Sequence, residues 1–496
     1  MRMITGASDN VVVVGAGFAG LAAALHLAGR GRSVTVLERA PVPGGRAGRL
    51  DLGDYRMDTG PTVLTMPEIV DETLTAVGES LPGWLALTRL DPAYRAMFAD
   101  GSGLDVHTDA DAMADAVREF AGPAEADGYR RLRAWLTKLY RVEFDRFIAA
   151  NLDSPLSLAG PALGRLAAMG AFRRLEPAIG RFLRDERLRR VFSFQSLYAG
   201  ETPRHALAIY AVIAYMDTVA GVYFPQGGMR ALPDALAGAA EKAGVRFRYR
   251  TEVSALERTG SRITAVRTAD GERHPCDAVV LATELETAYR LLGAVPWRPV
   301  PLRPAPSAVV LHLGARRQWP GTAHHTISFG AAWRTTFTEI IRDGRVMSDP
   351  SLLITRPTAT DPGLAPAGRD VLYLLAPAPN LARGRIDWDA QAASYAADLM
   401  DTVSARGVLP GLAGEIETCQ VVTPADWARQ GLVAGTPFSY AHTFWQSGPF
   451  RPANLPRSTD NAVLAGCGTV PGVGVPTALV SGRLAADRVT GPERRR

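Results

Sequence analysis

The most constraining feature of this chain is a run of four valines, 11–14, that leads directly into a G-x-G-x-x-G turn. The glycines of this turn are Gly15, Gly17 and Gly20. An alanine-rich amphipathic segment follows at 21–28, and a second apolar run at 33–37 ends on Glu38. Strand, glycine turn, helix, strand and terminal acid, in this order, are typical of a βαβ unit that binds a dinucleotide.

Each of these positions has a physical role in such a unit. Gly15 permits the tight turn, and Gly20 lets the helix and the strand pack closely. Gly17 lets backbone N–H groups reach a pyrophosphate at the helix N-terminus, where the helix dipole favours an anion. Glu38 can accept hydrogen bonds from both ribose hydroxyls. Because all the parts occur together, a glycine turn that binds nothing is the weaker interpretation.

The next segments indicate which dinucleotide is bound. Gly44 and Gly45 allow close backbone approach, and the Arg46 that follows them can pair with a diphosphate. A D-x-G-P-T segment comes next, at 58–62. A nicotinamide-binding domain would instead continue into its next helix and strand. The E-R-x(n)-G-G-R and D-x-G-P pattern resembles the FAD-binding half of the amine oxidase and carotenoid desaturase superfamily.

Length and composition narrow the class of protein. A chain of 496 residues is too long for one core, and 47% hydrophobic with 21% charged residues describes a globular protein. The cysteines are too far apart in sequence for a metal motif or a disulfide framework; they are Cys276, Cys419 and Cys467. We expect no metal. With neither a signal peptide nor a spanning helix in the pattern, we expect a cytoplasmic protein. The net charge of +5 comes mostly from scattered arginines, so we expect no nucleic-acid partner.

The order of elements predicts an α/β fold in several segments. Further buried strands are expected at 245–249, 278–283 and 461–466, and a hairpin at 251–268. A Rossmann-type FAD-binding domain built from discontinuous segments therefore accounts for the pattern, with an inserted α+β substrate domain and a helical membrane-facing part. The expected boundaries are 1–65, 223–300 and 450–496 for the FAD-binding domain, 66–222 for the largely helical substrate and membrane-facing region, and 301–449 for the substrate-binding domain.

One stretch of the helical region, 165–190, is strongly basic. Arginines alternate there with apolar residues at spacings of three and four. Two interpretations stay open: a solvated helix that packs on the protein's own core, or a surface that sits on anionic lipid.

The whole pattern resembles bacterial phytoene desaturases, a group of carotenoid desaturases. The motifs that carry the resemblance are D-T-G-P-T at 58–62, F-S-F-Q-S-L at 192–197, G-V-Y-F-P-Q-G-G at 221–228, A-H-H-T at 323–326, T-D-P-G-L-A-P at 360–366 and F-R-P at 450–452. The glycine-rich turn at 466–476 resembles the turn that closes over the flavin in this superfamily. Val470 and Cys467 depart from the usual His and Ala, at positions where the resemblance relates the residue type to flavin tuning and acceptor use.

The resemblance implies stepwise dehydrogenation of phytoene towards lycopene, in which a hydride passes to the flavin and a proton is lost. It implies FAD as cofactor, a peripheral membrane location, and quinone or oxygen as electron acceptor. The expected FAD contacts are Gly15, Gly17, Gly20, Glu38, Arg39, Gly45, Arg46, Gly60, Pro61, Thr62, Val253, Gly466, Gly468, Thr469, Gly474 and Val475. Val253 is expected to meet the adenine end through its backbone.

The catalytic acid and base are not identified by the sequence. His325, beside His324, and Asp217, in an apolar run, are candidates, although structural roles are commoner for both residue types. Three alternative functions stay open. They are desaturation of another apolar isoprenoid such as dehydrosqualene or neurosporene, isoprenoid binding without redox chemistry, and a soluble amine oxidase.

Overall fold

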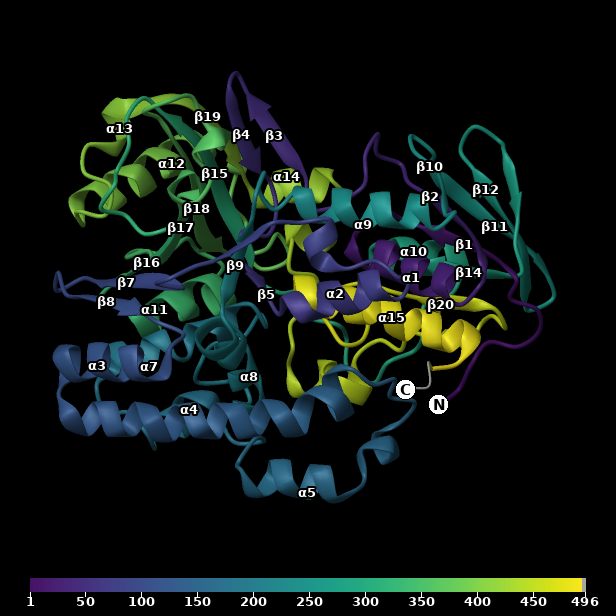
Figure 1. Ribbon diagram of the computed structural model, residues 1–496, viewed down its shortest axis with the longest axis horizontal. Coiled ribbons are helices and arrows are strands. Elements are labelled where there is room, and N and C mark those ends of the chain that lie inside the picture. Colours follow the sequence, from purple (N-terminus) through teal and green to yellow (C-terminus); the bar gives the residue numbers. More distant parts are fainter. Residues whose placement is uncertain (493–496) are drawn as a thin grey trace.

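The computed structural model describes residues 1–492, and its first sheet is parallel and five-stranded (Figure 1). Its strands are, in spatial order, β10 (Arg246–Arg248), β2 (Ser33–Leu37), β1 (Asn10–Val14), β14 (Ala278–Leu281) and β20 (Ala462–Leu464). All pairings between neighbours are parallel. The strands expected at these places are confirmed, and they come from three separated stretches of the chain.

Alternation along the valine run divides the two faces of this sheet. Val11 and Val13 belong to the apolar cluster that contains α1 (Phe18–Gly29) and α15 (Val475–Thr490). Val12 and Val14 belong to another cluster with α10 (Leu285–Leu292). Both faces are therefore covered, which is why every residue of the run is apolar.

Two helices and a small sheet complete this layer. Helices α2 (Pro67–Thr75) and α9 (Ala231–Lys242) pack beside α1. The expected hairpin is confirmed, as part of an antiparallel sheet of β11 (Val253–Thr259), β12 (Arg262–Thr268) and β13 (Arg273–Pro275). A Cβ at Gly482 would lie 2.3 Å from the carbonyl oxygen of Ala19, so α1 and α15 approach each other at backbone distance.

A second, seven-stranded sheet forms the other large layer (Figure 1). Its strands are, in order, β19 (Ile416–Val422), β15 (Ser307–Ala315), β18 (Asp370–Ala378), β17 (Leu352–Thr355), β16 (His325–Phe329), β7 (Tyr94–Phe98) and β8 (Gly103–Val106). Its accompanying helices are α11 (Trp333–Thr338), α12 (Trp388–Ala405), α13 (Leu412–Glu415) and α14 (Pro424–Arg429).

This second sheet crosses an expected boundary. Strands β7 and β8 lie in the 66–222 stretch, which we expected to be largely helical and separate from 301–449. Strand β7 pairs in parallel with β16, more than two hundred residues away. The sequence pattern of a strand reflects only its own burial, so it does not reveal which distant strand is its partner.

The rest of the 66–222 stretch is mostly helical. Its helices are α3 (Ala110–Ala121), α4 (Pro123–Glu143), α5 (Pro161–Ala168), α6 (Leu175–Ile179), α7 (Glu186–Val191) and α8 (Ala211–Tyr215). Single π-helical turns follow α4 and α8: η2 (Phe144–Ile148) and η6 (Met216–Ala220).

The basic stretch 165–190 is not one amphipathic helix, which corrects the expectation of a continuous helical face. The stretch is divided among three short helices, α5, α6 and α7. Gly170, just after the end of α5, has a left-handed backbone conformation (φ +79°) that ends this helix. Its main apolar residues, including Leu166, Leu175 and Ile179, are buried in the protein's own core. Most of its apolar side chains therefore pack inward, and Phe172 remains exposed.

Two small sheets link these layers. One is the hairpin of β3 (Arg49–Leu52) and β4 (Tyr55–Asp58). The other has the order β5–β9–β6, with β5 (Leu64–Thr65), β9 (Val222–Pro225) and β6 (Leu87–Arg89). Strand β5 begins two residues after the D-x-G-P-T motif, so it ties that motif to the helical stretch.

Candidate active site

One cavity of about 740 Å³ extends from the carboxyl ends of β1 and β2 to the second sheet. The end of the cavity beside β1 and β2 is called the nucleotide end. It lies outside the carboxyl ends of the strands, which is where open α/β sheets bind their ligands. The expected contacts that line this cavity are Gly15, Gly17, Glu38, Arg39, Gly45, Arg46, Gly60, Pro61, Thr62, Val253, Gly466, Gly474 and Val475. The fold thus brings together residues from all three stretches of the chain.

Glycines shape the nucleotide end of the cavity. Gly17 and Gly44 form an isolated parallel bridge, and a Cβ at Gly45 (φ +57°) would stand 3.2 Å from the Cα of Gly17. The two glycine motifs therefore meet backbone to backbone. Gly20 does not line the cavity, because a Cβ there would stand 1.9 Å from the carbonyl oxygen of Gly15. Its effect on binding is indirect: it permits close packing of the turn.

Glu38 is held rigidly at the end of β2. Its carboxylate accepts hydrogen bonds from the backbone N–H of Ala16 at 2.7 Å and of Ala40 at 2.8 Å. The side chain is buried, yet it borders the cavity. Each carboxylate oxygen has a second lone pair, so Glu38 can also accept ribose hydroxyls.

The glycine-rich turn before α15 borders the other side of the cavity. Gly474 stands at the helix N-cap with φ +127°, and Pro476 occupies the first turn, where a missing N–H does no harm. The sixteen-residue helix α15 points its N-terminus at the cavity, so its dipole favours negative charge there.

Gly468 and Thr469 are displaced from the expected surface. Neither lines the cavity; Gly468 faces Leu285, and the hydroxyl of Thr469 donates to the carbonyl oxygen of Pro452 at 2.6 Å. Cys467 and Val470 border the cavity instead. The turn doubles back here, and a glycine-rich sequence does not reveal which residues of such a turn face inward.

Arg451 is a positioning residue that the sequence pattern did not single out. The residue is 2% exposed, and its guanidinium donates to the carbonyl oxygens of Thr469 at 2.9 Å and of Cys467 at 2.6 Å. It lies in the F-R-P motif, so the motif itself was the available signal. A buried cation thus holds the turn from behind.

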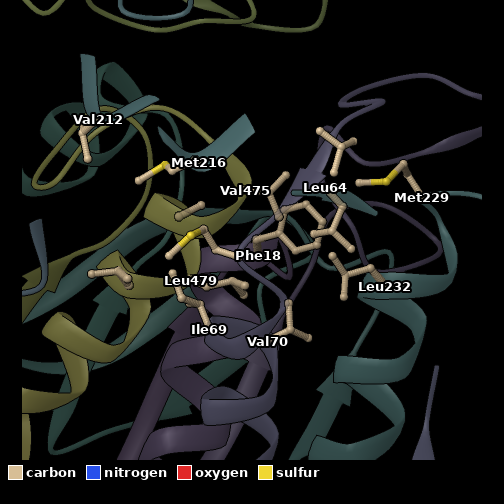
Figure 2. Close-up of a cluster of buried hydrophobic side chains, with 14 of the residues drawn as sticks. Phe18, Leu64, Ile69, Val70, Val212, Met216, Met229, Leu232, Val475 and Leu479 are labelled. Carbon is tan, nitrogen blue, oxygen red and sulfur yellow. The ribbon is translucent and has the colours of Figure 1, made fainter. Parts of the chain in front are cut away.

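Away from the glycine turns the cavity lining is mostly apolar. Its walls there come from α8, η6 and the second sheet, and the lining includes Val212, Ile213, Met216, Leu353 and Leu375. Figure 2 shows Val212 and Met216 in the cluster that also contains Val475 and Phe18. The apolar arm is therefore continuous with the end of the cavity formed by the α15 turn.

The two catalytic candidates from the sequence fall in different places. His325 lies outside this cavity and is buried in β16, where its Nδ1 contacts Thr355 Oγ1 at 2.9 Å; burial lowers its pKa to about 3. His324 contacts Thr360 Oγ1 at 2.7 Å. Asp217, in contrast, borders the apolar arm of the cavity. Only Asp217 of these residues is placed to meet a ligand there.

Comparison with known proteins identifies the family. The profile described as flavin containing amine oxidoreductase matches residues 18–490. The chain belongs to this family.

Relatives within the family are similar over nearly their whole length. The phytoene dehydrogenase of Streptomyces griseus is 63% identical over 494 residues, which cover 99% of this chain and 97% of that protein. The zeta-carotene-forming phytoene desaturase of Myxococcus xanthus is 36% identical over 490 residues, 97% and 93% of the two chains. A solved oxidoreductase from Methanosarcina mazei matches with a TM-score of 0.61 at 16% identity over 95% of this chain and 98% of that one, which shows the shared fold.

As a family member the chain is an oxidoreductase with FAD as its cofactor, and the cavity fits that group. Arg46 pairs with Glu284, while its buried Nε has no hydrogen-bond partner among residues 1–492. Arg46 follows the glycine pair that meets Gly17 and lines the cavity with it, so a diphosphate bound at these glycines could accept from this donor. Arg46 and Gly17 would therefore hold the diphosphate, Glu38 the ribose, and the α15 turn the flavin ring.

Proposed function

We propose that this oxidoreductase is a phytoene desaturase that dehydrogenates phytoene stepwise towards lycopene. The observation that carries the proposal is a single cavity in which a mostly apolar arm joins the end that is lined by the glycine turns and the start of α15. A hydrocarbon polyene has no polar group to recognise, so its binding energy has to come from burial of apolar surface. The names of the relatives at 63% and 36% identity supply the substrate class.

The chemistry divides between cofactor and protein. FAD, when bound, supplies the acceptor for a hydride. The protein orients the polyene against that end of the cavity and keeps water away from it. Val212 and Met216 suit this role, because their apolar side chains keep water away from the positive charge that develops on the polyene. That charge spreads over the conjugated chain, so no protein nucleophile is required.

We further propose that the enzyme collects its substrate from a membrane surface as a peripheral protein. None of the helices in the described part of the chain is long and apolar enough to span a bilayer. Two side chains that line the cavity are also exposed to solvent, Phe172 at 41% and Phe444 at 48%. They mark an apolar mouth through which a water-insoluble ligand can enter.

Exposed arginines stand on the same stretch as Phe172. They are Arg165, Arg173, Arg174, Arg181 and Arg184. Arg173 and Arg181 both lie near Gly170, so at least part of this charge is clustered. Cations around an apolar mouth favour an anionic lipid surface.

Expression in cells that accumulate phytoene, followed by identification of the carotenoids formed, tests the substrate. Desaturated products with loss of phytoene are expected, and their chain of double bonds gives the number of steps. Unchanged phytoene together with consumption of dehydrosqualene or neurosporene would assign another isoprenoid. A protein that binds the polyene but makes no product when FAD is bound would be a carrier. Purified enzyme supplied with quinone or oxygen identifies the acceptor.

A further inference from the structure

Most buried carboxylates in residues 1–492 form an ion pair with a cation or accept a hydrogen bond from a backbone N–H. These acids are Glu38, Glu125, Glu201, Glu339, Asp370 and Asp487. Such partners compensate the cost of removing a charge from water.

Two buried acids depart from this pattern, and both border the cavity. Glu143 is 5% exposed, and its Oε2 has no hydrogen-bond partner in the described part of the chain. Asp217 is also 5% exposed. It has no ion pair among residues 1–492. The side-chain amide of Gln195, whose Nε2 donates to the Tyr94 hydroxyl and to the carbonyl oxygen of Val191, lies close enough to oppose the rise in its pKa. The hydroxyls of Tyr94 and Tyr198 are the other titratable groups that face Asp217.

The backbone places Asp217 close to the FAD end of the cavity. It lies on the π-helical turn η6, which packs against β5, and β5 begins two residues after the D-x-G-P-T motif. Met216, its neighbour, is in the same cluster as Val475 at the start of α15 (Figure 2). Turns of this π-helical kind recur at functional sites, where they redirect single side chains.

We propose that the Asp217 carboxylate is the base that accepts the proton in each dehydrogenation, an inference that rests on the proposed function. The C–H bond beside the cationic carbon breaks, its electron pair becomes the new C=C bond, and the proton goes to an Oδ of Asp217. The polyene is oxidised by two electrons, which leave with the hydride to the family's cofactor. The carboxylate also stabilises the neighbouring cation, because the surroundings are poorly screened.

The ionisation states of the two acids favour Asp217 over Glu143. Burial raises the pKa of Asp217 to about 7, with the Gln195 side-chain amide opposing the rise. A substantial fraction is therefore ionised at neutral pH and can accept a proton. Burial raises the pKa of Glu143 well above its usual value, with no partner to oppose it. Glu143 is therefore the less suitable base of the two.

The test compares Asp217→Asn, Asp217→Glu and Glu143→Gln in FAD-loaded enzyme with phytoene in liposomes. The wild-type enzyme is assayed with phytoene before the variants. If it does not desaturate phytoene, the proposed function fails, and the infrared titration described below still tests the carboxyl at 217. Asp217→Asn is expected to lower kcat about 100- to 10,000-fold with FAD and phytoene binding retained. Asp217→Glu should recover part of the rate. The wild-type rate should fall as pH drops through about 7, and Glu143→Gln should keep that profile.

A second readout does not depend on turnover. Difference infrared spectra of the substrate-free enzyme should show a protonated carboxyl band that disappears as pH rises through about 7 and is absent in Asp217→Asn. The proposal is overturned if Asp217→Asn desaturates phytoene within twofold of wild type. It is equally overturned if Glu143→Gln is the variant that removes the acid limb, or if the titrating band persists in Asp217→Asn.

Discussion

Arg451 Nε donates a hydrogen bond to the carbonyl oxygen of Thr469 at 2.9 Å, and this contact fixes the turn on which the flavin end of the cavity is built. The side chain is almost completely buried, so carbonyl oxygens replace water as the hydrogen-bond acceptors of the guanidinium. Residues that never touch the cofactor can thus determine whether its site exists.

Replacing Arg451 by Met should therefore release the turn. Unpaired carbonyl oxygens cost about 1–3 kcal/mol each when they stay buried, so the free energy of unfolding should fall and FAD affinity should fall with it. Urea denaturation and FAD titration measure the two effects. Arg356→Met is a control at a buried cation that does not line the cavity. Arg356 donates to the carbonyl oxygen of Thr322 at 2.8 Å and also pairs with the buried Asp370, so this variant should lose at least as much stability. It should cost stability without a specific loss of FAD affinity; equal FAD affinities in the two variants would contradict the role of Arg451.

Glu38→Ala should weaken FAD binding by about 1.5–3 kcal/mol, because ribose hydroxyls lose a charged acceptor. The backbone N–H groups of Ala16 and Ala40 also lose their acceptor, so the turn itself loosens. Glu38→Gln, which keeps one carbonyl oxygen, should have a smaller effect. Fluorescence titration of the apoprotein with FAD gives the affinities. An affinity in Glu38→Ala equal to wild type would remove Glu38 from the site.

Gly474→Val should prevent the flavin ring from approaching the N-terminus of α15. Two effects are combined here, since φ +127° is unfavourable for valine and the added side chain would enter the cavity wall. Gly271→Val separates them, because Gly271 also has a positive φ (+92°) but nothing lies within 4 Å of its Cβ position. Flavin absorbance of the purified variants should be lost only at position 474. Retention of bound flavin and turnover in Gly474→Val would show that this turn does not contact the ring.

Changing Arg173, Arg174, Arg181 and Arg184 together to Gln should reduce binding to anionic liposomes. Each arginine near such a surface contributes about 1 kcal/mol, and the attraction should weaken as salt rises. Flavin content should not change, because the four residues lie outside the cavity. A control with the same loss of charge replaces Arg56, Arg317, Arg383 and Arg385, which are exposed on other segments. Equal sedimentation of the two variants would leave the basic stretch as an ordinary solvated surface.

Asp217→Asn should change how stability depends on pH. The folded-state pKa of Asp217 is raised from 3.8 to about 7, so the wild-type group stabilises the fold below pH 3.8 and this contribution is lost as pH rises to about 7. Asparagine does not titrate. The stability of the variant relative to wild type should therefore increase by about 1.4 kcal/mol per pH unit across this window and level off above it. Urea denaturation at about pH 5 and about pH 8 measures the difference.

Asp54→Asn, at an exposed position, should leave the pH dependence of wild type unchanged. If Asp217→Asn also follows the wild-type curve, the carboxyl at 217 is not held near neutrality by burial.

Local pattern was sufficient for the first βαβ unit and most of the nucleotide end. The valine run, the paired glycines and Glu38 act within a few dozen residues, and their roles follow from backbone geometry and strand alternation. Gly468 and Thr469 were misplaced because the side of a turn that faces a ligand depends on what holds the turn, here Arg451. His325 was a plausible base by residue type, but its burial in β16 comes from the neighbouring strands.

The sequence by itself determined the class of cofactor and the strands that carry it, because those signals are short-range and repeat with the period of the element. Tertiary structure alone decided that β7 joins β16, that the basic stretch is broken into short helices over the protein's own core, and that Asp217 reaches the cavity. These outcomes depend on contacts between residues far apart in the chain. A side chain's partners and its access to a ligand are properties of packing, which no local pattern encodes.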